Sequence, residues 1–196
     1  MSETFDGKVI ILTAPSGAGK TTVVNHLLMI NPKLAFSISA TTRKQRPHEK
    51  DGVDYYFMSI EQFNRHIAED AFLEWEEVYQ DNFYGTLKSD VERIWSLKQH
   101  IIFDVDVKGA TSLKSHFGSR ALAIFIRPPS LQVLVDRLKD RATESPKELK
   151  KRISRVKNEL TFEQSFDKIL VNDILDVALK EAELMVDEFI NNCNTD

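Results

Sequence analysis

Cysteine is almost missing from this 196-residue chain, in which Cys193 is the single example. One thiol cannot form an internal disulfide, and it cannot supply the cysteine cluster of a structural zinc site. No hydrophobic run approaches the roughly 20 residues that cross a bilayer. The first residues are polar and acidic, unlike a secretory signal. We therefore expect a cytoplasmic protein that has no membrane segment.

A net positive charge is also missing. The 26 Lys and Arg residues against 30 Asp and Glu residues give a net charge of −4, which disfavours a nucleic-acid binder. Basic residues are nevertheless concentrated between Arg137 and Lys157, where nine of them accompany three acids. Such a segment suits a small polyanion, although the same charges could form a solvated helix face. We interpret Arg155 and Lys157 in that second way.

Strand-like and helix-like segments alternate along the chain, which predicts an α/β fold with a parallel sheet flanked by helices. Short buried strands are expected at 8–13, 100–106, 120–127 and 168–172. Apolar residues at helical spacing predict helices at 20–30 and 174–190. A chain of this length that is 42% hydrophobic can form one domain with a full core.

One segment breaks this alternation with too much β-structure for a simple crossover. Strand-like pieces are expected at 36–39, 55–58 and 72–79, around a helix near 61–69. They predict a mixed α+β lobe inserted at 37–88.

A second irregular segment, 142–165, is expected to form a helical lid. Ser145 and Pro146 make a favourable helix start, with serine as the cap and proline at the first position. A narrow apolar stripe follows, so we expect a lightly packed, mobile helix. The core would then consist of residues 1–36, 89–141 and 166–196.

A glycine-rich turn between the first strand and the first helix has the context of a nucleoside triphosphate-binding loop. Its residues are Ala14, Pro15, Ser16, Gly17, Ala18, Gly19, Lys20, Thr21 and Thr22. In such a loop, backbone N–H groups and the helix N-terminus bind phosphate oxygens. Lys20 would reach the β- and γ-phosphates, and the Thr21 hydroxyl would bind Mg²⁺. Because Ala14 replaces the first glycine of the motif, the turn should keep a negative φ there.

A second group of side chains suits a phosphorylated acceptor. Arg43 and Arg46 lie close together in the sequence, and an arginine fork binds two phosphate oxygens at once. Tyr55 follows nine residues later and can add a hydroxyl donor. Two acids, Asp104 and Asp106, are expected at the carboxyl end of a buried strand, where α/β proteins bind ligands.

Taken together, these motifs resemble the guanylate kinase family over nearly the whole chain, from about residue 8 to residue 189. The matching motifs, in chain order, are Ala14–Thr22, Ser39–Arg46, Gly52–Phe57, Phe72–Trp75, Tyr84–Thr86, Asp104–Gly109, Pro128–Ser130 and Val171–Asp173. The resemblance implies a P-loop fold, with ATP and GMP as the small-molecule partners and Mg²⁺ as the cofactor.

The resemblance also implies a role for each matching residue. Guanine would be read by Glu74, Thr86 and Asp106. The GMP phosphate would be held by Ser39, Arg43, Arg46, Tyr55 and Tyr84. Asp104 would lie near the metal, with Thr21, partly through water. The transferred phosphoryl group would meet Lys20, Arg43, Arg137, Arg141 and Arg152.

Two other functions remain open from the sequence. The same scaffold could phosphorylate AMP or a phosphorylated sugar, although a carboxylate at Glu74 argues for guanine. It could also be a catalytically inactive, guanylate-kinase-like module that binds proteins. The intact loop and the arginines at 141 and 152 argue against that reading.

Overall fold

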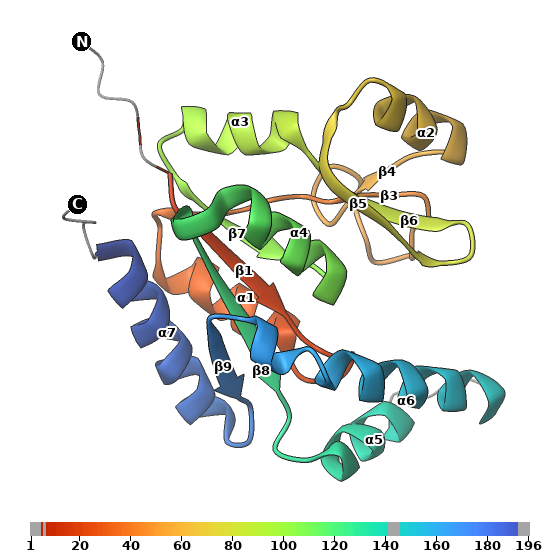
Figure 1. Ribbon diagram of the computed structural model, residues 1–196, viewed down its shortest axis with the longest axis vertical. Helices are drawn as coiled ribbons and strands as arrows, with labels where there is room; N and C mark the ends of the chain where they lie inside the picture. Colours follow the sequence, from red (N-terminus) through yellow and green to blue (C-terminus); the bar gives the residue numbers. More distant parts are fainter. Residues whose placement is uncertain (1–4, 6, 141–145, 192–196) are drawn as a thin grey trace.

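The computed structural model describes residues 5, 7–140 and 146–191. A five-stranded sheet, in the order β2-β7-β1-β8-β9, lies at its centre (Figure 1). Its strands are β1 (Val9–Thr13), β2 (Leu34–Phe36), β7 (His100–Asp104), β8 (Ala121–Arg127) and β9 (Lys168–Val171). Every neighbouring pair is parallel, which confirms the predicted sheet. The expected first helix, α1 (Lys20–Ile30), is also found.

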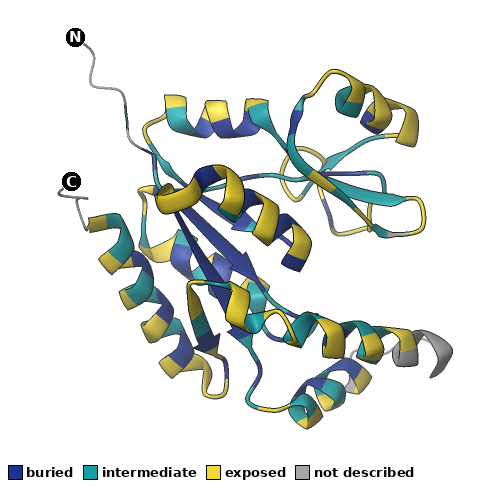
Figure 2. Ribbon diagram, in the orientation of Figure 1, coloured by how far each residue is buried: buried dark blue, intermediate teal, exposed yellow. Residues whose placement is uncertain are grey.

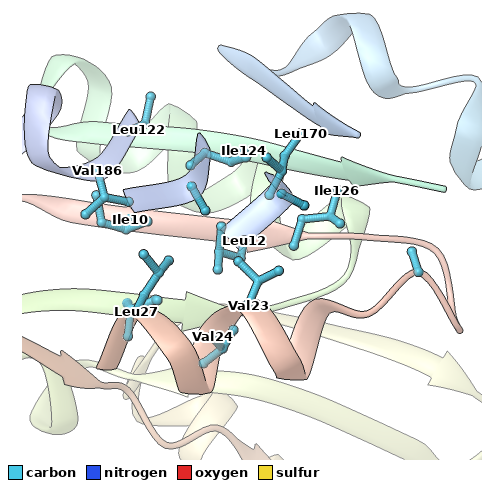
Figure 3. Close-up of a cluster of buried hydrophobic side chains, with 14 of the residues drawn as sticks. Ile10, Leu12, Val23, Val24, Leu27, Leu122, Ile124, Ile126, Leu170 and Val186 are labelled. Carbon is cyan, nitrogen blue, oxygen red and sulfur yellow. The ribbon is translucent and has the colours of Figure 1, made fainter. Parts of the chain in front are cut away.

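The central strands are buried between helices (Figure 2). Helices cover both faces of the sheet because these strands carry apolar residues on both sides. Ile10 and Leu12 of β1 pack with α1 and α7 (Leu175–Asn191), as Figure 3 shows. The alternate residues Val9 and Ile11 pack with α3 (Lys88–Ser96) and α4 (Val107–Phe117). Two 3₁₀ turns, η1 (Gly118–Arg120) and η2 (Glu163–Ser165), precede β8 and β9.

A second sheet, in the order β4-β3-β6-β5, forms a separate layer to one side of the core (Figure 1). Its elements are β3 (Ala40–Thr41), β4 (Tyr56–Phe57), α2 (Ile60–Ala68), β5 (Phe72–Tyr79) and β6 (Asn82–Leu87). We call residues 40–87 the second lobe. Its own small core contains the stacked rings of Phe63 and Phe72, whose centroids are 4.4 Å apart. The strand expected at 36–39 is wrong, since Phe36 ends β2 in the central sheet and β3 begins only at Ala40.

Two further helices, α5 (Leu131–Asp140) and α6 (Pro146–Leu160), lie beside the phosphate loop (Figure 1). The expected cap Ser145 lies outside the described residues. Helix α6 packs more tightly than expected at Val156, which is 1% exposed and belongs to the main core cluster. Among the described residues, no helix has both the length and the apolar character needed to cross a membrane.

Candidate active site

The loop between β1 and α1 has the backbone geometry that a phosphate-binding turn requires. Gly17 and Gly19 have φ values of 92° and 96°, which strain any other residue. Ala14 is not among the residues with positive φ, so its replacement of glycine causes no strain. Asn172 directly follows β9, and its side-chain amide donates a 2.7 Å hydrogen bond to the Ala18 carbonyl. A Cβ on Gly19 would lie 2.3 Å from that amide nitrogen, so glycine is required there.

Lys20, the first residue of α1, lies against the carboxyl end of β7. Its ammonium forms an ion pair with the Asp104 carboxylate and donates a 2.9 Å hydrogen bond to the Val105 carbonyl. Thr21 lines the same cavity as Asp104. A cation and oxygen ligands are therefore gathered where the loop would present phosphates.

A cavity of about 380 Å³ joins the loop, the second lobe and α6. It brings together most of the side chains that the sequence suggested. These are Ala14, Pro15, Ser16, Gly17, Gly19, Lys20, Thr21, Thr22, Ser39, Tyr55, Glu74, Tyr84, Asp104, Asp106 and Arg152. The suggested residues that do not line it are Ala18, Arg43, Arg46, Thr86 and Arg137. Arg141 lies outside the described residues.

At the lobe end of the cavity, Glu74 and Thr86 face each other across β5 and β6. The Thr86 hydroxyl donates a 2.7 Å hydrogen bond to Oε1 of Glu74. Burial raises the pKa of Glu74 to about 7, and the nearby charge of Asp106 adds to the rise against the effect of the Thr86 bond. Asp106 was expected at the end of the strand, but β7 ends at Asp104. Asp106 instead caps α4, where its Oδ1 accepts a hydrogen bond from Gly109 N at 2.9 Å.

Arg43 is held by an acid that the sequence analysis missed. Its guanidinium donates two 2.7 Å hydrogen bonds to the carboxylate of Glu49 and lies 4.8 Å from the centre of the Tyr55 ring. The hydrogen bond from Arg43 is the main reason that the pKa of Glu49 falls to about 2. Arg46 is 63% exposed, with Nη1 3.8 Å from the same carboxylate. The sequence signal for this pair was the position of Glu49, six residues after Arg43 and three residues after Arg46.

Helix α6 contacts both ends of the cavity through arginines. At the loop, Arg152 donates a 3.0 Å hydrogen bond to the Ser16 hydroxyl. At the lobe, Arg155 donates to the Val78 carbonyl at 3.1 Å and to Oδ2 of Asp106 at 3.3 Å. The interpretation of Arg155 as a solvated helix charge is therefore wrong. The one sequence signal for it was Glu159, four residues on, whose Oε1 accepts from Arg155 at 2.7 Å.

Fold and site together define a P-loop protein of the α/β class, in which residues of a second lobe line the same cavity as the phosphate loop. Comparison with known proteins then gives the family. The family model for guanylate kinase matches residues 6–189, so this chain belongs to the guanylate kinase family.

Its relatives match over nearly their full length. The chain is 47% identical to guanylate kinase of Bacteroides fragilis, over 96% of this chain and 92% of the relative. It is also 47% identical to guanylate kinase of Porphyromonas gingivalis, over 93% and 98%. The crystal structure of guanylate kinase from Anaplasma phagocytophilum superposes with a TM-score of 0.74 at 28% identity, covering 95% of this chain and 88% of that one.

Proposed function

We propose that this chain transfers the γ-phosphoryl group of ATP to GMP, giving ADP and GDP by direct in-line displacement. The observation that carries the proposal is the placement of Glu74 in the cavity that also contains Lys20 and the phosphate loop. A base-reading carboxylate and a triphosphate-binding loop thus share one space. Phosphoryl transfer needs positioning and charge neutralisation rather than a covalent nucleophile, and this cavity supplies both.

Glu74 is the proposed reader of guanine. An ionised carboxylate accepts from guanine N1–H and N2–H₂ together, whereas adenine presents a lone pair at N1. Binding adenine would leave the buried carboxylate unpaired, at a cost of order 1–3 kcal/mol. Thr86 holds one oxygen of Glu74 by its hydrogen bond. Asp106, at the start of α4, adds a second carboxylate to the cavity.

The GMP phosphate is proposed to bind nearer the loop. Ser39, Tyr55 and Tyr84 line the cavity, so their hydroxyls can donate to phosphate oxygens. The guanidinium of Arg43 lies over the ring of Tyr55, and the ion pair with Glu49 holds it in place. Arg46 is the more exposed of the two arginines, so it would have to swing inward to reach the phosphate.

The ATP phosphates are proposed to bind along the backbone of residues 14–22, with Lys20 reaching the β- and γ-oxygens. Arg152 lies on Ser16 at this end and would neutralise charge on the transferred group. Arg137 and Arg141 remain proposals for the same task. Thr21 and Asp104 fit Mg²⁺ because both offer oxygen ligands to one cavity. When bound, the metal neutralises phosphate charge.

The same reading proposes three parts: the core, a GMP-binding lobe at 37–88 and a lid at 142–165. Closure of the lid over both nucleotides would exclude water and suppress ATP hydrolysis. The contacts of Arg152 and Arg155 with opposite ends of the cavity support that role for α6.

ADP production from Mg-ATP tests the function, with GMP, AMP, CMP or UMP supplied singly beside a control without acceptor. We expect ADP with GMP alone. ADP with AMP or another acceptor in place of GMP would give the scaffold another specificity, and ADP without any acceptor would indicate an ATPase. No ADP under any condition would favour the protein-binding module.

A further inference from the structure

Asp90, the third residue of α3, has a fully buried carboxylate that no proposed step uses. Its Oδ2 accepts from the Ser37 hydroxyl at 3.0 Å and from Ile38 N at 2.9 Å. Its Oδ1 accepts from the Tyr56 hydroxyl at 3.2 Å and from Arg93 Nη2 at 2.8 Å. A buried carboxylate is tolerated only when such donors surround it, so this arrangement is strongly specified.

Two of the donors, Ser37 and Ile38, come from the connection by which the chain enters the second lobe, and Tyr56 comes from β4 inside the lobe. The chain enters the lobe through residues 37–39, between β2 and β3, and it leaves β6 at Leu87 to start α3 at Lys88. Asp90 lies just past the exit and binds the entry through Ser37 and Ile38. It therefore joins the two connections directly.

The same carboxylate binds the sequence neighbours of two cavity residues. Ile38 precedes Ser39, and Tyr56 follows Tyr55; both Ser39 and Tyr55 line the cavity. The two segments are also tied to each other, because Tyr56 N donates a 2.9 Å hydrogen bond to the Ser39 carbonyl. A shift at Asp90 would thus move Ser39 and Tyr55, two of the proposed ligands of the GMP phosphate.

We propose that Asp90 is a positioning residue for the acceptor site: it clasps the entry and exit of the second lobe and so sets Ser39 and Tyr55 toward GMP. The inference rests on the proposed function for the identity of that ligand. It concerns GMP only, because none of these contacts reaches the phosphate loop.

The test compares Asp90→Asn with wild type, by steady-state kinetics for both nucleotides and by calorimetric binding of GMP. The asparagine amide keeps the shape of the carboxylate, but its NH₂ group replaces one of the two oxygens. That group then faces another donor, either Ile38 N or the Arg93 guanidinium. We expect the KM and Kd for GMP to rise about tenfold, and the KM for ATP to change less than about twofold. Glu92→Gln is the matched control, since that acid is exposed on the same helix as Asp90.

Two milder variants keep the test decisive if Asp90→Asn does not fold. Ser37→Ala and Tyr56→Phe each remove one donor and little volume, and each should weaken GMP binding about threefold. Unchanged GMP affinity in both, or equal changes for GMP and ATP in any of the three, would overturn the inference.

Calorimetry separates this inference from the proposed function. Wild-type protein that binds GMP but makes no ADP would contradict the proposed function alone. Weaker GMP binding by Asp90→Asn would then still support the positioning role of Asp90. Wild-type protein that does not bind GMP would overturn both.

Discussion

The hydroxyl of Thr86 donates to Oε1 of Glu74 across directly paired positions of β5 and β6. The bond holds Oε1 of Glu74 in place, and Glu74 still lines the cavity. Burial raises the pKa of this carboxyl from 4.5 to about 7. The acid that is proposed to select the base is therefore poised to change charge near neutral pH.

GMP affinity should improve as the pH rises through about 7, because only ionised Glu74 accepts both guanine donors. The KM for GMP, measured between about pH 6 and pH 8, checks this. The GMP phosphate also titrates in this range, near pH 6, so each profile is divided by that of Glu74→Gln. A ratio that is independent of pH would contradict the role of Glu74. Glu92→Gln, on the exposed side of α3, serves as the control.

The same pKa predicts the sign of a stability change. The folded protein holds the Glu74 proton more tightly than the unfolded chain, so this group's contribution to stability falls as pH rises from 4.5 to about 7. The loss should be absent from Glu74→Gln. Urea unfolding of both proteins across that range measures the difference, and parallel stability profiles would disprove it.

Lys20→Ala should lower kcat at least about a hundredfold, the scale of losing one charge contact in the transition state. The variant also leaves Asp104 without its ion-pair partner, so thermal unfolding is recorded beside the kinetics. Lys33→Ala, on an exposed lysine after α1, should behave like wild type. Near-normal turnover of Lys20→Ala would remove the lysine from the mechanism.

Arg43→Ala should raise the KM for GMP much more than that for ATP. Glu49→Gln should do the same to a smaller degree, because the amide keeps one of the two side-chain oxygens that Arg43 binds on Glu49. Initial rates at varied GMP and varied ATP separate the two constants. Equal effects on both substrates would mean that the acceptor phosphate binds elsewhere.

Asn172→Ala should act on the opposite substrate. The amide supports the Ala18 carbonyl from a 5% exposed position, so its loss should cost about 1–3 kcal/mol of unfolding free energy. It should also raise the KM for ATP while leaving that for GMP near normal. Denaturant unfolding and initial rates measure both effects, with Asp173→Ala on the exposed neighbour as the control. A loss of GMP affinity instead would contradict the assignment of the loop to ATP.

Arg155→Met should loosen α6 in the nucleotide-free protein. Removing the guanidinium breaks its bonds to Val78 and Asp106 and keeps an apolar stem, so amide exchange in residues 151–160 should quicken. Lys157→Met, on an exposed lysine of the same helix, should not change it. Identical exchange in wild type and Arg155→Met would show that these bonds do not hold the helix.

Local pattern predicted α1 and four of the five strands of the central sheet, all but β2, because buried aliphatic runs and a glycine turn specify them almost without tertiary help. It failed at 36–39, because Phe36 ends β2 and β3 begins only at Ala40. The two-residue β3 exists through its pairing with β4 and β6. Arg155 was misread because its partners Asp106 and Val78 lie 49 and 77 residues away in the sequence. Such contacts follow from topology, which no local window contains.

The second lobe has its own sheet and its own apolar core around Phe63, apart from the two clusters that flank the central sheet. The proposed base reader Glu74 and the phosphate loop therefore lie in separately stabilised parts of one chain. In evolutionary terms, this separation would let the lining of the lobe change toward another acceptor while the phosphate loop stays as it is.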